Sequence, residues 1–238
     1  MTNIGVLILE SRNTKLGLAD DALLANEAVL IPELLEGLPF RFFATSSIDA
    51  LIHAVESFTS PKASPFSRMY STEAIRMILN GFKQIGAKGE DARLNHMKGF
   101  LMASNYAGIA FSNAGCAAVH AMSFPLGGKY HVPHGEANYA LFTEVYKMYQ
   151  KLQPVGAIQD LNRLLAECLG CPESQVYEAL ETLLNKLLQK QPLRAYGVKE
   201  SELEEFTDIV IEKQGRLMAN NYTELNRETV LEIYKTLY

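Results

Sequence analysis

Apolar positions near the start of the chain form two short, nearly continuous runs. Ile4-Gly5-Val6-Leu7-Ile8-Leu9 and Ala28-Val29-Leu30-Ile31-Pro32 contain β-branched residues and are bounded by turn residues. Runs of this length and composition are typical of β-strands. Two strands do not make an independent domain. We therefore expect residues 1–38 to pack on the remainder of the chain, or to belong to a sheet whose other strands lie elsewhere.

From Leu38 onward the apolar positions recur at helical spacing. The clearest sets are Ile48, Leu51, Ile52, Val55 and Phe58, and then Ala74, Ile75, Ile78, Leu79 and Phe82. Small residues dominate 98–122, which predicts a closely packed central helix hairpin. Further helices are expected at about 136–151, 157–169, 173–190, 200–219 and 227–237. Ser201 and Glu204 would form a capping box within the fourth of these. The pattern predicts a mainly α protein, with an all-helical domain over 39–238.

Composition and charge narrow the classes of partner. The chain has 238 residues, 48% of them hydrophobic, which is ample for a packed core. Its net charge is −5, and the 22 basic residues are scattered among 27 acids, so nucleic acid is not expected as a partner. No apolar run approaches the roughly 18 to 20 residues of a membrane-spanning helix. The N-terminus also lacks the pattern of a secretory signal. We expect a cytoplasmic globular protein.

The cysteines carry no obvious chemistry. Cys116, Cys168 and Cys171 are too few for a disulfide framework. Cys168 and Cys171 form a C-x-x-C, but a zinc site of that type needs a second pair. Gly170 between them is expected to end one helix, and Pro172 to begin the next. We interpret the pair as structural.

Asp49 and His53 are the first candidate metal ligands. They stand four residues apart in a helical segment, so their side chains project from one face a single turn apart. Glu56 lies about one further turn along. Its carboxylate could accept the second ring N–H of a ligating histidine. An ordinary surface glutamate is an equally good interpretation.

His120 and His134 are the second pair of candidates. The residues that punctuate their segment are Pro125, Gly127, Gly128, Pro133 and Gly135. The first three are expected to break the helix that carries His120, and the last two to fix the backbone around His134. A loop would thus return His134 toward its partners.

Together these residues offer one carboxylate and three imidazoles. The set Asp49, His53, His120 and His134 suits Fe²⁺ or Zn²⁺ and leaves room for a substrate oxygen. Any one histidine on an apolar helix face is more often a satisfied core residue. A carboxylate among Ile48, Leu51 and Ile52 is harder to explain without a partner, because burying an unpaired charge is costly.

These segments resemble the iron-containing (group III) alcohol dehydrogenases. The resemblance is carried by Ile48-Asp49-Ala50-Leu51-Ile52-His53-Ala54-Val55-Glu56, Val119-His120-Ala121-Met122-x-x-Pro125-Leu126-Gly127 and Pro133-His134-Gly135. The 4-hydroxybutyrate branch of that family is resembled at Ser104-Asn105-Tyr106-Ala107-Gly108-Ile109-Ala110-Phe111, at Tyr130-His131-Val132-Pro133-His134-Gly135-Glu136-Ala137-Asn138-Tyr139 and at Asn220-Asn221-Tyr222.

The resemblance implies a function and a fold. It implies a dehydroquinate synthase-like helical bundle that holds the metal through Asp49 and the three histidines. The short β segment would be the remnant of an α/β nucleotide-binding domain. Lys15 would approach the ribose of NAD, and Val6 would line its nicotinamide side. The implied reaction is the NAD-linked interconversion of 4-hydroxybutyrate and succinate semialdehyde.

Two departures from the family pattern matter. The glycine-rich phosphate-binding motif is missing, because Gly127-Gly128 follows a proline and has no strand before it. The chain is therefore expected to be the C-terminal part of a longer enzyme, and its uncovered surface to favour a homo-oligomer. Phe124 stands where many members carry a further histidine implicated in proton handling, and the 4-hydroxybutyrate branch resembles this chain in having an aromatic residue there.

Other roles remain open. His131 could relay a proton or meet a substrate carboxylate, or simply face solvent. Lys129 is near enough along the chain to be suspected as the carboxylate's partner. Two alternatives to a dehydrogenase are a metal-binding and assembly module without catalysis, and a metal-dependent lyase or hydrolase. The lack of a second obvious general base disfavours the last.

Overall fold

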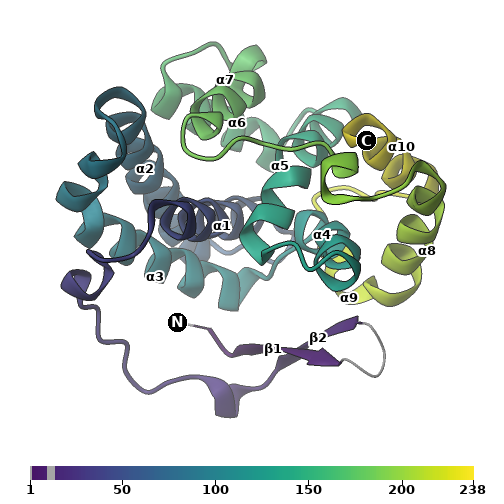
Figure 1. Ribbon diagram of the computed structural model, residues 1–238, viewed down its shortest axis with the longest axis horizontal. Helices are drawn as coiled ribbons and strands as arrows, with labels where there is room; N and C mark the ends of the chain where they lie inside the picture. The colour runs from purple at the N-terminus through teal and green to yellow at the C-terminus, as the bar shows by residue number, and fades with distance from the viewer. Residues whose placement is uncertain (1, 10–13) are drawn as a thin grey trace.

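Ten α-helices and one two-stranded sheet make up the described part of the computed structural model (Figure 1). It describes residues 2–9 and 14–238, and the side chains of residues 6–9, 14–17 and 19 lie outside that description. The helices are α1 (Phe40–Thr59), α2 (Pro65–Lys88), α3 (Met97–Ala114), α4 (Ala118–Lys129), α5 (His134–Leu152), α6 (Ala157–Leu169), α7 (Val176–Asn185), α8 (Leu203–Lys213), α9 (Gly215–Met218) and α10 (Arg227–Leu237). Short 3-10 helices are Asp21–Leu23, Pro32–Leu35, Glu90–His96, Glu173–Gln175, Leu193–Tyr196 and Glu200–Glu202. The prediction of a mainly α protein is confirmed.

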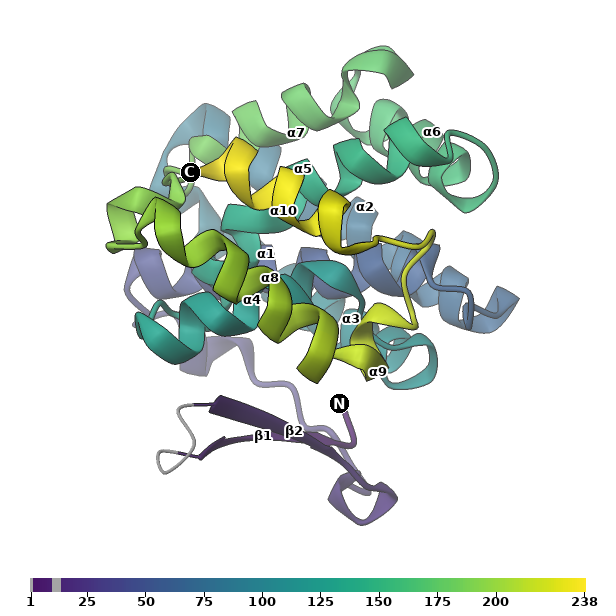
Figure 2. The same ribbon diagram turned by 90° about the vertical axis from the view of Figure 1, so that its right-hand side faces the viewer.

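The N-terminal strands form a hairpin of local partners. Strand β1 (Ile4–Leu9) pairs antiparallel with β2 (Thr14–Ala19), in a register that sets Ile4 opposite Ala19. The hairpin lies beneath the helices, and β2 contacts α4 (Figure 2). The predicted strand at 28–32 is wrong, since that run is exposed and leads into the 3-10 helix at Pro32–Leu35. An apolar run becomes a strand only where another strand offers backbone hydrogen bonds. Strand β1 pairs with the nearer segment Thr14–Ala19, so it does not pair with 28–32.

Helix α1 lies at the centre of the bundle, with α2 and α3 on one side and α5 on the other (Figure 1). Its predicted apolar stripe is fully buried at Ile48, Leu51 and Ile52. Helix α5 contributes large buried aromatic side chains to the same core, and the Tyr146 hydroxyl lies 2.9 Å from Thr59 Oγ1 of α1. The residues that flank Asp49 and His53 are therefore held in a close-packed setting.

Residues 98–122, which are rich in small side chains, do not form the predicted helix hairpin. Gly115, at φ 78°, ends α3, and α4 begins three residues later. Helix α3 packs on α1 and α2, whereas α4 packs on α5 and α8, so the two do not form a hairpin with each other. The amide of Asn220 donates to the carbonyls of Ala114 (2.9 Å) and Cys116 (3.1 Å). A distant side chain thus holds the turn that precedes His120.

Helix α4 continues through Pro125 to Lys129, which contradicts the predicted break. An interior proline removes one helical hydrogen bond and typically costs about 3 kcal/mol. Pro125, Leu126 and Gly127 are buried among neighbouring helices, so tertiary packing outweighs that local cost. His134 accordingly does not follow a long loop. It is the first residue of α5, separated from α4 by the four residues 130–133.

Of the remaining local predictions, two agree with the structure and one is wrong. Helix α6 ends at Leu169, and Gly170 adopts the left-handed conformation as predicted. Cys168 and Cys171 are free thiols, which agrees with a structural interpretation. The predicted capping box of Ser201 and Glu204 is wrong. The Lys199 N–H instead donates to Glu202 (2.7 Å), because the chain enters α8 through a 3-10 turn.

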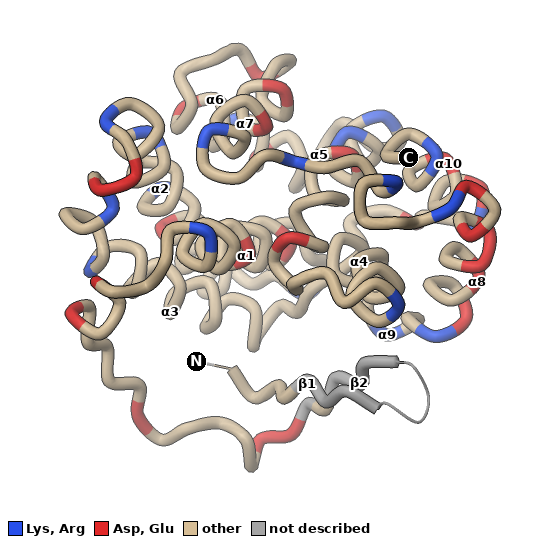
Figure 3. Tube along the Cα trace, in the orientation of Figure 1, with Lys and Arg blue, Asp and Glu red and all other residues tan. Residues whose placement is uncertain are grey.

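The surface shows no single-sign stripe among the described residues. Basic and acidic residues are both spread over the helices (Figure 3). None of the described helices is both long enough and apolar enough to cross a membrane.

Candidate metal centre

Four predicted ligands from three helices meet at one point. Asp49 and His53 come from α1, His120 from the first turn of α4 and His134 from the start of α5. One donor atom from each lies within 4.8 Å of the donors of all the others. The structure therefore brings together residues that are up to 85 positions apart in the chain, from Asp49 to His134.

The spacing of the donors fits one small cation. His120 Nε2 lies 3.1 Å from His53 Nε2 and 3.8 Å from Asp49 Oδ1. His134 Nε2 lies 4.0 Å from the same carboxylate oxygen. A tetrahedral ion with bonds of about 2.0–2.1 Å sets its ligands roughly 3.3 Å apart, so a slight contraction would satisfy the set. One oxygen and three nitrogens also form a donor set that Fe²⁺ and Zn²⁺ accept.

Gly135 allows His134 to reach the cluster. A Cβ at this position would overlap the Thr45 carbonyl oxygen of α1 and come within 3.1 Å of Asp49 Cβ. Only a residue without a side chain lets the first turn of α5 lie this close to α1. Pro133 directly precedes α5 and sets the extended backbone at its N-cap.

Glu56 fixes the orientation of His120 from the buried side. This carboxylate is fully buried, and it accepts from His120 Nδ1 at 2.6 Å. It also accepts the backbone N–H groups of Ala117 (3.1 Å) and Val119 (2.7 Å). Because Nδ1–H is donated to Glu56, Nε2 faces the cluster and offers its lone pair there when the ring is neutral, as a metal ligand requires. The surface interpretation of Glu56 is therefore wrong, since three contacts within the core satisfy its charge.

Two of the four candidate ligands, Asp49 and His53, have the protonation state that a bound cation requires. Burial alone would raise the pKa of Asp49, but His53, His134 and His120, which can carry positive charge in the acidic range where Asp49 titrates, lower it, so the carboxylate is ionised near pH 7. Burial is the main cause that lowers the pKa of His53 to about 4, which keeps its ring neutral near pH 7. Burial also disfavours the charged ring of His120, but Cys116 and Glu56 outweigh it and raise its pKa. A metal ion that binds His120 would therefore have to displace a proton from its ring.

Asn138 is a further site residue, for which no role was predicted from the sequence although it lies in the segment 130–139 that resembles the family. Its fully buried amide donates from Nδ2 to Asp49 Oδ1 at 2.7 Å, and the same nitrogen lies 3.2 Å from His134 Nε2. It stands four residues after His134 on α5, so helical spacing placed the two on one face. That spacing was the signal available in the sequence. The hydrogen bond to Asp49 orients the carboxylate toward the cluster.

Two cavities open onto the ligands. One, of about 510 Å³, is lined by Asp49, His53 and His134 together with residues of α3. The other, of about 230 Å³, is lined by His53, His120, His134, Phe124 and Arg216 among others. Exposure of the ligands increases across the cluster, from 6% for the His120 side chain to 39% for that of His134. The cluster is therefore most accessible to solvent on the His134 side.

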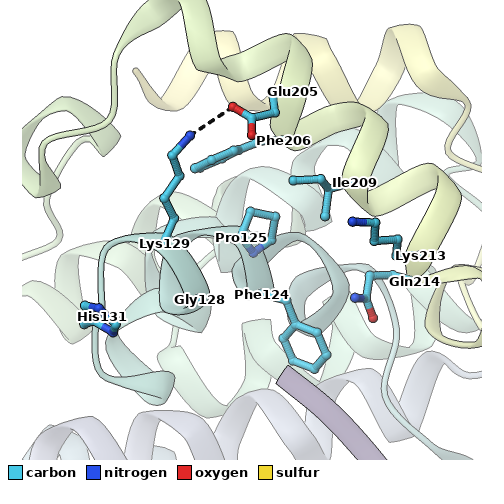
Figure 4. Close-up of a pocket in the computed structure, with 10 residues that line it drawn as sticks. All are labelled: Phe124, Pro125, Gly128, Lys129, His131, Glu205, Phe206, Ile209, Lys213 and Gln214. Atoms are coloured by element: carbon cyan, nitrogen blue, oxygen red, sulfur yellow. Dashed lines mark hydrogen bonds and ion pairs between the residues drawn. The ribbon is translucent and has the colours of Figure 1, made fainter. Parts of the chain in front are cut away.

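His131 and Lys129 lie in a neighbouring cavity between α4 and α8 (Figure 4). This cavity is about 350 Å³, and Phe124 lines both it and the smaller ligand cavity. His131 is exposed, has a φ of 54°, and is absent from the lining of both ligand cavities. Lys129 Nζ lies 2.9 Å from a carboxylate oxygen of each of two glutamates, Glu202 and Glu205. Its charge is therefore already paired.

For the two residues predicted to contact NAD, the structure describes the backbone alone. Val6 lies opposite Gly17 in the hairpin, and Lys15 opposite Ile8. The side chains of Val6 and Lys15 lie outside the described residues. Their assignment to NAD stays a prediction.

The fold and the ligand cluster define a helical metal-binding domain. Residues 43–238 match the model of the C-terminal region of the Fe-containing alcohol dehydrogenase family. The chain belongs to that family.

Named relatives agree with this membership. The chain is 54% identical over its whole length to the 4-hydroxybutyrate dehydrogenase of Clostridium kluyveri, of which it covers 64%. It is 35% identical to the long-chain-alcohol dehydrogenase 1 of Geobacillus thermodenitrificans, of which it covers 60%. A solved 1,3-propanediol oxidoreductase superposes on the whole chain with a TM-score of 0.88 and 27% identity, with 62% of that structure covered. The chain thus spans less than two thirds of the length of these relatives.

Proposed function

We propose that Asp49, His53, His120 and His134 bind one Fe²⁺ or Zn²⁺ ion. The observation that carries this proposal is the convergence of one carboxylate and three imidazole nitrogens within 4.8 Å. The buried Glu56 supports it, because a carboxylate behind a ligating histidine is a common feature of metal sites. We further propose that residues 39–238 form the metal-binding catalytic domain and that residues 1–38 belong to a nucleotide-binding part.

The reaction we propose is the NAD-linked interconversion of 4-hydroxybutyrate and succinate semialdehyde. The relative in Clostridium kluyveri that bears the name 4-hydroxybutyrate dehydrogenase supports this substrate over other alcohols. Hydroxy acid and NAD⁺ give aldehyde acid, NADH and one proton. A bound Fe²⁺ or Zn²⁺ supplies Lewis acidity, which lowers the pKa of an alcohol and polarises an aldehyde carbonyl.

The protein's own residues position the reacting groups. Glu56 and Asn138 hold His120 and Asp49 in fixed orientations, so little reorganisation is needed when a ligand arrives. The open side near His134 leaves space for a substrate oxygen. Phe124, whose ring centroid is 6.5 Å from that of His134, presents an apolar surface beside this space.

Removal of one ligand tests the proposal. Metal content per chain, measured by elemental analysis after purification with Fe²⁺ or Zn²⁺, should be close to one in the parent protein and near zero in His53→Ala. His131→Ala is the matched control, because it removes an exposed imidazole outside the cluster and should retain the metal. One tightly bound ion per chain in His53→Ala would refute the assignment.

A second candidate is a metal-binding and assembly module without catalysis. The observation that favours it is the lack of a glycine-rich phosphate-binding motif in the sequence. Titration with NADH, followed by nucleotide fluorescence, separates the two. Saturable binding supports the dehydrogenase, and a bound metal without nucleotide binding supports the module. The homo-oligomer also stays a prediction.

For His131 we propose proton relay or substrate contact, on the basis of its place in the turn before His134. If His131→Ala leaves both the pH–rate profile and the Michaelis constant unchanged, neither role holds.

A further inference from the structure

We infer that Arg216 binds the carboxylate of the hydroxy-acid substrate. This inference rests on the proposed function, and it names the group that selects a substrate with an anionic end. From the sequence, Lys129 was the residue suspected for this role. The structure points instead to the short helix α9, which lies beside α4.

Arg216 and three of the proposed ligands line one cavity. The cavity of about 230 Å³ has His53, His120 and His134 in its wall together with Arg216. A cavity whose wall carries both a cation and a proposed metal site suits a molecule with an oxygen group for each. An aliphatic hydroxy acid of four carbons has that form.

Arg216 and Lys129 differ in whether their charge is paired with a carboxylate. Lys129 already lies against Glu202 and Glu205. Within the described residues, no carboxylate lies within ion-pair distance of Arg216, and none of the residues that line its cavity is acidic. A guanidinium is always charged and presents a planar fork of donors that matches a carboxylate. Arg216 is therefore available to an anionic ligand.

The surroundings of Arg216 suit the rest of such a substrate. Phe124 and Leu217 line the same cavity and offer apolar contacts to a methylene chain. Leu217 is 5% exposed, so it anchors α9 in the core next to Arg216. The helix start is also fixed, since the Leu217 N–H donates to the Gln214 carbonyl at 2.9 Å. Arg216 thus projects from an anchored element rather than from a loose loop.

Binding of a charged and an uncharged ligand tests the inference. The Zn²⁺-loaded full chain is titrated by calorimetry, at low ionic strength, with 4-hydroxybutyrate and with butane-1,4-diol, in which a hydroxymethyl group replaces the carboxylate. Arg216→Ala should weaken 4-hydroxybutyrate binding about 10- to 100-fold, as expected for hydrogen bonds to a charged group. Its affinity for the diol should stay within about twofold of the parent. Arg216→Lys should recover part of the loss, because it keeps the charge without the fork.

Lys213→Ala is the matched control. Lys213 is an exposed cation three residues away that lines the neighbouring cavity instead. The Lys213→Ala variant should bind 4-hydroxybutyrate with an affinity within about twofold of that of the parent chain. The inference is overturned if Arg216→Ala binds 4-hydroxybutyrate like the parent, if Lys213→Ala loses as much, or if the diol is weakened equally. Metal content is measured on the same samples. A parent chain with no metal overturns the proposed function itself, whereas a metal-loaded parent with no affinity for 4-hydroxybutyrate overturns only the choice of substrate and the role of Arg216.

Discussion

The ligand cluster has a buried side, at His120, and an open side, at His134, which differ in exposure and in the contacts that hold the ligand. On the buried side, His120 is 6% exposed and is held by Glu56, whose charge is satisfied by one ring N–H and two backbone N–H groups. On the open side, His134 is 39% exposed and stands at the start of a helix beside two cavities. The buried side therefore holds its ligand in a fixed orientation, whereas the open side leaves the cluster accessible, as the proposed reaction would require. Substitutions on the two sides should therefore differ in their effects.

The largest effect is expected on the buried side, from Glu56→Ala. This change leaves two backbone N–H groups and His120 Nδ1 without their acceptor. Stranded buried donors cost about 1–3 kcal/mol each, so the free energy of unfolding should fall by about 3 kcal/mol. Zn²⁺ affinity should fall about 10- to 100-fold. Urea denaturation and competition with a chelator measure the two quantities.

Glu56→Gln is the control for this prediction. It keeps the volume and one acceptor oxygen, so it should lose less stability than the alanine variant. Equal stability in the parent and Glu56→Ala would contradict the claim that this carboxylate supports the buried side.

Gly135→Ala should disturb the open side. The added methyl group would overlap the Thr45 carbonyl and push α5 from α1, which moves His134 away from Asp49. Overpacking of this kind costs about 1–3 kcal/mol. We expect that loss in urea denaturation, together with weaker Zn²⁺ binding. Gly37→Ala is the matched control, because an added Cβ there meets nothing within 4 Å, and it should leave both quantities unchanged. If the two variants behave alike, the close approach of α5 to α1 does not position His134.

The smallest effect is expected from Glu202→Gln, which tests the turn before His134. The hydroxyl of Tyr130 is the main cause, ahead of Lys129, that lowers the pKa of Glu202 to about 2. Because the pKa is lower in the folded state, the carboxylate stabilises the fold above its ordinary pKa, and this contribution is lost as the pH falls from about 4.5 toward 2. At pH 7 the variant should lose about 1 kcal/mol, allowing for solvent screening. The difference from the parent should shrink in urea denaturation as the pH falls from about 4.5 toward 2. A difference that stays unchanged over this range would assign the effect to packing instead of charge.

Local patterns in the sequence predicted the helices and the shared helix face of Asp49 and His53, because the causes of these features are local. The stripe of Ile48, Leu51 and Ile52 gave the buried face of α1, and the spacing of Asp49 and His53 placed them one turn apart. These inferences need only the helical period.

The errors share a different origin, since each depends on contacts distant in the chain. Helix α4 continues through Pro125 because its neighbours bury it. The run at 28–32 is not a strand because β1 pairs with β2 instead. Arg216 reaches the ligand cavity only through the packing of α9, and no spacing in the sequence indicates this. Sequence periodicity describes one element at a time, whereas these outcomes depend on which elements meet.

X-ray absorption spectroscopy of the Zn²⁺-loaded chain tests the central claim most directly. A second group of potential ligands, Glu56, Cys116 and His120, shares His120 with the proposed site, so the two positions predict different shells. At the proposed site, oxygen and nitrogen neighbours are expected at about 2.0–2.2 Å, with the outer-shell scattering of three imidazole rings. A sulfur neighbour at about 2.3 Å, with one imidazole, would place the ion at Cys116 and contradict the claim.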